Sequence, residues 1–232
     1  MSPTPRRTEA EALIEGTPVY TGYKIARKRM FRFYLFVKRA IDVVGSLAGM
    51  IMLLPLFIIV SLLIKLEDPR GPIIFSQVRI GKNEKPFRMY KFRSMVSNAE
   101  ELLENLLEKN EIEGAMFKMK DDPRITLVGK FIRKTSIDEL PQLWNVFIGD
   151  MSIVGPRPPL PREVAEYTNY EKQRLKVTPG CTGLWQVSGR NELSFREMVE
   201  LDLKYIKERG LLSDIKIILK TFKVLFGSKD AF

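Results

Sequence analysis

The chain has 232 residues, a formal net charge of +10 and a hydrophobic fraction of 45%, which suits one ordinary domain with a short appendage. It contains no histidine and one cysteine, Cys181, so an internal disulfide, a cysteine-cluster metal site, a zinc-histidine site and a Ser-His-Asp triad are excluded. Catalysis must then use carboxylates, Lys, Arg, Tyr, backbone amides or a hard cation. The positive charge favours an anionic partner: nucleic acid, a lipid headgroup surface or a phosphorylated substrate.

The N-terminal region, residues 1–30, is predicted to be a basic extension. Residues 1–23 lack sustained periodicity and are expected to be poorly ordered. Residues 24–39 then mix seven cations and four aromatic side chains without any acidic residue. This mixture is typical both of stacking on nucleic-acid bases and of an anchor at a membrane interface. The segment that follows favours the membrane.

Residues 31–66 are predicted to form a re-entrant membrane helix. The run Val43–Ile64 contains no charged residue and is long enough to cross a bilayer as a helix. Pro55 lies within it, where proline removes a backbone donor and clashes with the preceding turn. Both flanks are basic, which favours keeping both on the cytoplasmic side. A helix–break–helix hairpin at Pro55 satisfies these features, and a kinked through-span is the alternative.

The remainder, residues 67–232, is predicted to be a small cytoplasmic catalytic domain, which makes the whole chain a helix-dominated α+β protein. Short strands are expected at 72–78 and 87–92, joined by a turn at 81–83. Helices are expected at 97–110, 139–148, 162–176 and 195–208. The tail 212–226 alternates lysines with bulky apolar residues, which fits either an amphipathic helix on the membrane surface or packing into the domain core.

Several cations are candidates for binding phosphate. Lys91 and Arg93 lie two positions apart near the end of a predicted strand, where they either bind a diphosphate or are simply solvated. Arg157 stands between two prolines that restrict the backbone, and its planar guanidinium suits phosphate recognition. Arg190 ends a glycine-rich segment that starts at residue 178. Cys181, in the same segment, is interpreted as structural because no histidine is present to activate it.

Asp138 and Glu139 are the candidate reactive carboxylates. Being adjacent, their side chains diverge by about 100° on a helix, so two separate roles suit them better than a shared proton. Two structural interpretations compete with catalysis. Ser136 and Glu139 resemble a capping box, although Pro141 argues against it, and Asp138 as the N-cap would place Pro141 within the first turn, where proline is tolerated.

Taken together, the motifs closely resemble the bacterial sugar transferase family, whose members are monotopic phosphoglycosyl transferases. The series runs KR..D, an apolar hairpin with a central Pro, GP..F.Q.R.G, KFRSM, DPRIT..G, TS.DELPQ.WNV, GDMS.VGPRP and PG.TGLWQVSGR. The likeness covers residues 38–225. It implies a re-entrant hairpin broken at Pro55 and a catalytic domain on the cytoplasmic face of the bacterial inner membrane.

The resemblance also implies a mechanism. Asp138 matches the nucleophile that attacks the β-phosphorus of a UDP-sugar, releasing UMP and leaving a phosphosugar on the enzyme. Undecaprenyl phosphate then takes up the sugar phosphate, and Glu139 matches the carboxylate associated with Mg²⁺. The implied cationic positions are Lys91, Arg93, Arg133, Arg157 and Arg190.

The expected partners are thus a UDP-sugar, undecaprenyl phosphate and inner-membrane lipid, with a homodimer left open and nucleic acid not expected. Overall likeness favours galactose or glucose as the sugar, in the initiation of exopolysaccharide, capsule, O-antigen or glycoprotein glycan assembly. A non-catalytic membrane scaffold of the same fold is the alternative. A third hypothesis, a basic nucleic-acid-binding protein, conflicts with the long apolar run, which favours a membrane.

Overall fold

The protein is described here from a computed structural model, which covers residues 18–104, 119, 122–189 and 193–227. The chain divides into two compact units, Met1–Ile41 and Asp42–Phe232. Helix α2 (Pro18–Met52) begins in the first unit, so residues 18–23, expected to be poorly ordered, are helical. Within the first unit the rings of Phe31 and Tyr34 are in contact, with centroids 5.9 Å apart.

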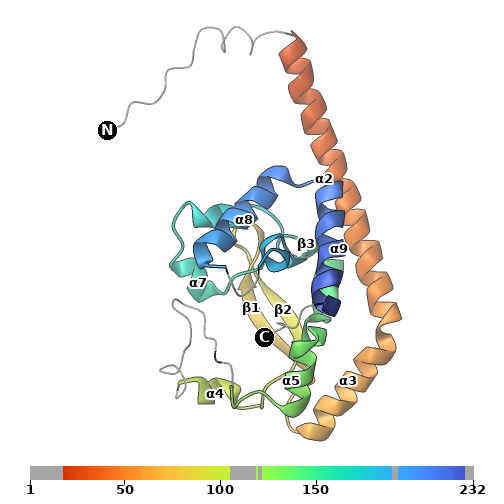
Figure 1. Cartoon of the computed structure of the whole chain (residues 1–232), viewed down its shortest axis with the longest axis vertical. Coiled ribbons are helices and arrows are strands. Elements are labelled where there is room, and N and C mark those ends of the chain that lie inside the picture. The colour runs from red at the N-terminus through yellow and green to blue at the C-terminus, as the bar shows by residue number, and fades with distance from the viewer. Residues whose placement is uncertain (1–17, 105–118, 120–121, 190–192, 228–232) are drawn as a thin grey trace. The chain divides into compact units, whose positions relative to one another are not determined.

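The apolar run forms two helices that meet at a break. Helix α2 ends at Met52, and α3 (Leu54–Glu67) follows at a bend of 60° (Figure 1). The intervening Leu53 has φ −90° and ψ 4°, and Pro55 lies in the first turn of α3. Proline cannot donate to the preceding turn but fits a helix start, which explains a break just before it. Among the described residues no single helix meets the length and hydropathy of a membrane span, whereas this bent pair meets them together.

Small residues of α2 contact the rest of the second unit. A β-carbon added at Gly45 would lie 3.0 Å from Cδ1 of Ile153, and one at Gly49 would lie 3.2 Å from Cδ1 of Leu143. Asp42 is buried and its Oδ1 accepts hydrogen bonds from Oγ of Ser152 at 3.0 Å and N of Ile153 at 2.8 Å. The second half of α2 is therefore held against Leu143, Ser152 and Ile153 by both packing and hydrogen bonds.

One face of α3 is buried and the other is apolar and exposed. Val60 and Ile64 pack with Phe92 and Ile132 in a hydrophobic cluster. The exposed apolar residues of this helix are Leu54, Ile58, Ile59, Leu62, Leu63 and Leu66. Water would solvate such a face poorly, so it is suited to an apolar surrounding.

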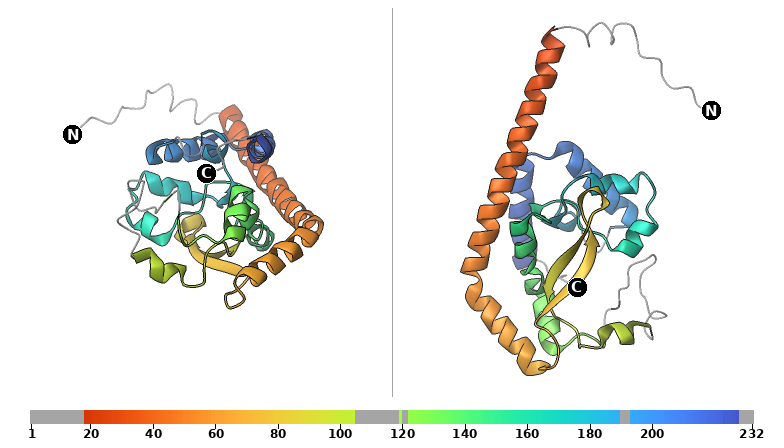
Figure 2. Two further views of the ribbon diagram at one scale, coloured as in Figure 1. Left: turned by 60° about the horizontal axis from the view of Figure 1, so that its bottom comes forward. Right: turned by 180° about the vertical axis from the view of Figure 1, so that it is seen from behind.

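An antiparallel ribbon of β1 (Ile74–Ile80) and β2 (Pro86–Phe92) lies between α5 (Leu127–Lys134) at one end of the second unit and α8 (Phe195–Glu208) at the other (Figures 1 and 2). The two predicted strands are confirmed, with the first shifted by two residues. Asn145 of α6 (Gln142–Ile148) accepts from N of Tyr90 at 3.0 Å and donates to O of Arg88 at 2.7 Å. These bonds satisfy the outer edge of β2 with a side chain instead of a third strand.

A second, parallel pair joins β3 (Ser152–Val154) to β4 (Gly180–Thr182). The backbones approach so closely after this pair that a β-carbon at Gly180 would lie 2.0 Å from N of Gly155. The core next to it contains Val154, Tyr205 of α8 and Ile217 of α9 (Leu211–Gly227). Helix α9 therefore packs one face into the core, while its opposite face leaves Leu212, Ile215, Leu219 and Phe222 exposed.

The remaining elements are short. They are η1 (Lys82–Glu84), α4 (Ala99–Glu104), η3 (Ile137–Glu139), α7 (Pro161–Ala165), η4 (Glu171–Lys176) and η5 (Trp185–Val187). The helix predicted at 162–176 is thus two pieces, and the one predicted at 139–148 begins at Gln142. Residues 105–110 of the predicted helix 97–110 lie outside the described residues. The described residues form a helix-dominated fold, as predicted, with two small sheets, of which the parallel β3–β4 pair was not predicted.

Candidate active site

Asp138 and Glu139 belong to η3, a single 3₁₀ turn between α5 and α6. Ser136, just before it, has a left-handed backbone with φ 55°, which is uncommon outside glycine. Neither capping interpretation is confirmed: η3 and α6 start without any side-chain cap bond, and the residue at the start of α6 is Pro141. Both were wrong because a 3₁₀ turn separates the acidic pair from the α-helix. Asp138 is nonetheless buried, with 8% of its surface exposed.

Lys91 of β2 lies next to both carboxylates. Its Nζ is 2.6 Å from Oε1 of Glu139, to which it donates a hydrogen bond, and 4.0 Å from Oδ2 of Asp138. Consecutive side chains diverge on a 3₁₀ turn. The Asp138 side chain is accordingly 12% exposed and that of Glu139 41% exposed. The predicted divergence of the two acids is therefore present, although on a tighter turn than expected.

The two carboxyl groups have pKa values displaced in opposite directions. Burial raises the pKa of Asp138 from 3.8 to about 6, against the opposing effect of Lys91. For Glu139, partial burial acts in the same sense, but Lys91 and then Arg157 and Arg79 hold the pKa below its ordinary value. Such separated values at neighbouring acids are typical of sites where each has a different task.

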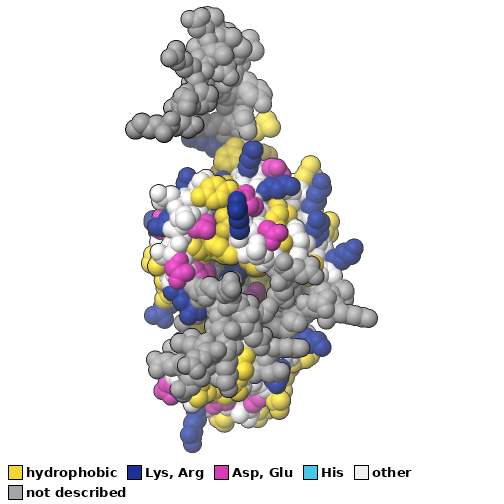
Figure 3. All heavy atoms as spheres, turned by 60° about the vertical axis from the view of Figure 1, so that its left-hand side comes forward, with side chains coloured by type: hydrophobic (Ala, Val, Ile, Leu, Met, Phe, Trp, Pro, Cys, Tyr) yellow, Lys and Arg dark blue, Asp and Glu magenta, His cyan; other side chains and the backbone are white. Residues whose placement is uncertain are grey.

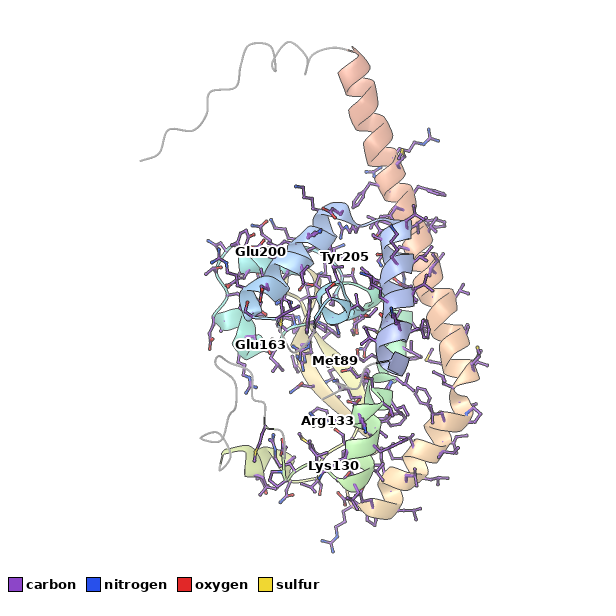
Figure 4. All side chains as sticks on the ribbon, in the orientation of Figure 1. Met89, Lys130, Arg133, Glu163, Glu200 and Tyr205 are labelled. Carbon is purple, nitrogen blue, oxygen red and sulfur yellow. The ribbon has the colours of Figure 1, made fainter. Side chains whose placement is uncertain are left out.

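Further cations surround the pair. Arg133, in the last turn of α5, lowers the pKa of Asp138, and Arg157 lowers that of Glu139. Arg133 lies between Lys130 and the β2 residue Met89 in the view of Figure 4. Elsewhere on the surface, the face in Figure 3 intersperses basic, acidic and hydrophobic side chains. The cations near the acidic pair come from separate segments of the chain, which the fold brings together.

One of the predicted binding residues, Arg93, is not part of this group. Arg93 is buried, and its guanidinium contacts Asp68, with Nη1 3.2 Å from Oδ2 and Nη2 donating to the backbone O at 2.7 Å. Gly71 leaves room for it, since an added β-carbon would be 1.2 Å from Nη1. This arrangement ties the end of α3 to the end of β2. Arg190 lies outside the described residues.

The acidic pair suits a magnesium ion shared with a substrate better than a resident metal. Within the described ranges no group of three or more His, Cys, Asp or Glu side chains is placed to hold an ion. Mg²⁺, however, is usually held by one or two carboxylates together with substrate phosphates and water. The half-exposed carboxylate of Glu139 has the chemistry for that arrangement.

Sequence reasoning missed several buried polar residues. Asp202 of α8 is fully buried and pairs with Arg174, which also donates to the hydroxyl of Tyr167 at 3.2 Å. Burial raises the pKa of Asp202 to about 6, opposed by Arg174. Arg79 is also buried and belongs to the motif F.Q.R.G, whereas Asp202 and Arg174 belong to no motif quoted above, and no property of the sequence distinguishes those two from solvated charges. Burial also raises the pKa of the Cys181 thiol, which agrees with a structural role.

Comparison with known proteins gives a consistent result. The chain is 49% identical to galactosyl transferase CpsE of Streptococcus agalactiae over 89% of its length and 46% of that protein. It is 47% identical to undecaprenyl-phosphate galactose phosphotransferase of Salmonella typhimurium, over 85% of its length and 42% of that protein. It thus spans less than half of these two relatives. The exopolysaccharide production protein ExoY of Sinorhizobium fredii is 40% identical and is covered over 88% of its length.

The model of the family described as bacterial sugar transferase matches residues 33–228. That range contains the bend between α2 and α3, the acidic pair and every cation described around it. The chain belongs to the bacterial sugar transferase family.

Proposed function

We propose that the protein transfers a sugar 1-phosphate from a UDP-sugar to undecaprenyl phosphate, with release of UMP. The names of its relatives support this reaction, since they include undecaprenyl-phosphate galactose and glucose phosphotransferases. The observation that carries the proposal is the buried Asp138, whose pKa of about 6 leaves it ionised at neutral pH, with Lys91 and Arg133 acting on its charge. A partly desolvated carboxylate of this kind is suited to nucleophilic attack.

In the first step, an Asp138 carboxylate oxygen forms a bond to the β-phosphorus of the donor. The bond from that phosphorus to the bridging oxygen breaks, and UMP leaves with the oxygen. Lys91, Arg133 and Arg157 stabilise the charge on the phosphoryl oxygens, and Glu139 would be the carboxylate that holds Mg²⁺. The chemistry that Mg²⁺ would supply there is neutralisation of negative charge on the diphosphate.

In the second step, an oxygen of undecaprenyl phosphate attacks the same phosphorus and regenerates the carboxylate. This acceptor is a lipid, so the site has to work at a membrane. The bent pair α2 and α3, with its exposed apolar face, supports a re-entrant hairpin in the bacterial inner membrane that leaves the catalytic domain on the cytoplasmic side.

The sugar is proposed to be galactose, because galactose appears in the names of three relatives at 43% to 49% identity. Glucose and N-acetylgalactosamine occur in the names of relatives at 40% and 38% identity. The product would start the assembly of an extracellular or surface polysaccharide, as the ExoY relatives suggest.

The test is UMP release by purified protein with undecaprenyl phosphate, Mg²⁺ and a panel of UDP-sugars. Release with UDP-galactose that is lost in Asp138→Asn supports the proposal. Absence of release with every donor, from folded protein in lipid nanodiscs, would instead favour a non-catalytic membrane scaffold. Trapping of a labelled phosphosugar on wild-type protein, but not on the variant, would identify the covalent step.

A further inference from the structure

The turn that carries Arg157 is held in place by strand β1. Arg79 of β1 donates from Nη1 to the carbonyl oxygen of Pro158 at 3.1 Å, and the backbone N of Ile80 donates to that of Pro159 at 2.9 Å. Proline has no N–H to offer a neighbour, so this turn depends on donors from elsewhere to satisfy its carbonyl groups. The position of Arg157 is therefore coupled to the side chain of Arg79.

Arg79 is also a buried cation that is only partly compensated: Glu163 and Glu139 raise its pKa from a distance, but neither pairs with it. Its surface is 6% exposed, Nη2 donates to the neutral Oε1 of Gln77 at 2.8 Å, and Nε has no acceptor. Among the described residues no carboxylate forms an ion pair with it. Burial, and then the positive charge of Arg157, lower the pKa of Arg79 to about 10. A buried charge of this kind is costly unless an anion approaches it.

We propose that Arg79 is a positioning residue that orients the Arg157 turn, and that the diphosphate of the donor adds negative charge near its buried guanidinium, which has no ion-pair partner among the described residues. The inference rests on the proposed function, because it deepens the account of donor binding there. Arg79 makes no contact with the acidic pair and acts through the turn and through its field. The effect of Arg79 on donor binding therefore has two components: the position of the turn and the positive charge of the guanidinium.

The experiment compares Arg79→Met, Arg79→Lys and the control Arg88→Met in the full chain. Arg88 lies on the neighbouring strand with an exposed side chain, so its replacement removes one positive charge without touching the turn. Inorganic pyrophosphate is titrated into each protein and its binding is followed by the shift in Tm, which requires no turnover. KM and kcat for UDP-galactose are measured in parallel.

Arg79→Met is expected to weaken pyrophosphate binding and to raise KM by about ten- to a hundredfold, the scale of one charge-assisted interaction. Arg79→Lys, which keeps the charge but not the forked hydrogen bonds, is expected to restore most of KM and to leave kcat at least about tenfold low. Arg88→Met is expected to match the wild type. The lysine variant thus separates the effect of charge, seen in KM, from the effect of geometry, seen in kcat. A general loss of folding would not change kcat while leaving KM nearly normal.

Equal pyrophosphate binding in Arg79→Met and Arg88→Met would overturn the inference, as would full kcat in Arg79→Lys. If Arg79→Met does not fold, the lysine variant still decides, because the proposal requires a normal KM with a low kcat. A wild-type protein that binds pyrophosphate in an Arg79-dependent way but releases no UMP would refute the proposed reaction and support the anion-binding role of Arg79.

Discussion

Replacement of Asp138 by Asn should increase stability while abolishing turnover. Burial raises the pKa of this carboxyl from 3.8 to about 6, a displacement of about two pH units. Each unit corresponds to about 1.4 kcal/mol, so keeping Asp138 ionised in the folded state costs about 3 kcal/mol at neutral pH. Asparagine has nearly the same shape but no charge to bury, and its amide is a poor nucleophile. The variant should therefore gain up to about 3 kcal/mol in free energy of unfolding.

The sign of the pH dependence follows from the raised pKa. Between pH 3.8 and about 6 the folded protein holds a proton on Asp138 that the unfolded chain has released. Below pH 3.8 Asp138 therefore makes its full contribution to the free energy of unfolding, and this contribution is lost as the pH rises to about 6 and beyond. The difference in stability between Asp138→Asn and wild type should be near zero at pH 4 and should reach its plateau above pH 7.

The assay is chemical denaturation of both proteins in the same detergent or nanodisc at several pH values, with UMP release measured on the same samples. Glu139→Gln is the matched control, because its carboxyl has a lowered pKa and the same change should not stabilise the protein. A variant less stable than wild type at pH 7, or a difference independent of pH, would refute the argument from burial. A stable variant that still released UMP would remove Asp138 as the nucleophile.

Three other changes test different parts of the structure. Lys91→Met should shift the acidic limb of the pH–rate profile upward, since Lys91 lowers the pKa of Asp138, and should reduce kcat by about a hundredfold; an unshifted limb would contradict this role. Asp42→Ala leaves the buried donors of Ser152 and Ile153 without an acceptor and should cost about 2–4 kcal/mol by denaturation, whereas Asp42→Asn should cost clearly less. Pro55→Leu should favour one continuous helix, so a cysteine added at the N-terminus should become labelled from the periplasm; unchanged labelling would show that Pro55 does not determine the hairpin.

Local patterns in the sequence predicted a large part of the fold. The uncharged run with Pro55 predicts the bent helix pair because the effect of proline on a helix is local. The alternating pattern around the turn at 81–83 predicts the β1–β2 ribbon for the same reason. Helix boundaries near Asp138 were predicted less well, since a 3₁₀ turn and an α-helix have similar local signals there.

The motifs also identified Asp138, Glu139, Lys91 and Arg157, the residues on which the proposed function depends. The motifs did not show which charged side chains are buried or which residue each of them contacts. Lys91 and Arg93 lie two residues apart in one motif, yet one contacts Glu139 and the other contacts Asp68 at the end of α3. Sequence spacing alone does not distinguish these partners, because both arise from segments far away in the chain.

By itself, then, the sequence indicated the family, the break in the apolar helix and the candidate carboxylates Asp138 and Glu139, because these depend on residue types in order along the chain. Only the tertiary structure decided the raised pKa of Asp138 and the hydrogen bond from Arg79 to the turn at Pro158. Both follow from burial and from long-range contacts, in which a strand near residue 79 meets a turn near residue 158. Desolvation depends on the packed fold, so the free-energy cost of ionising a side chain is set only when its neighbours are packed around it.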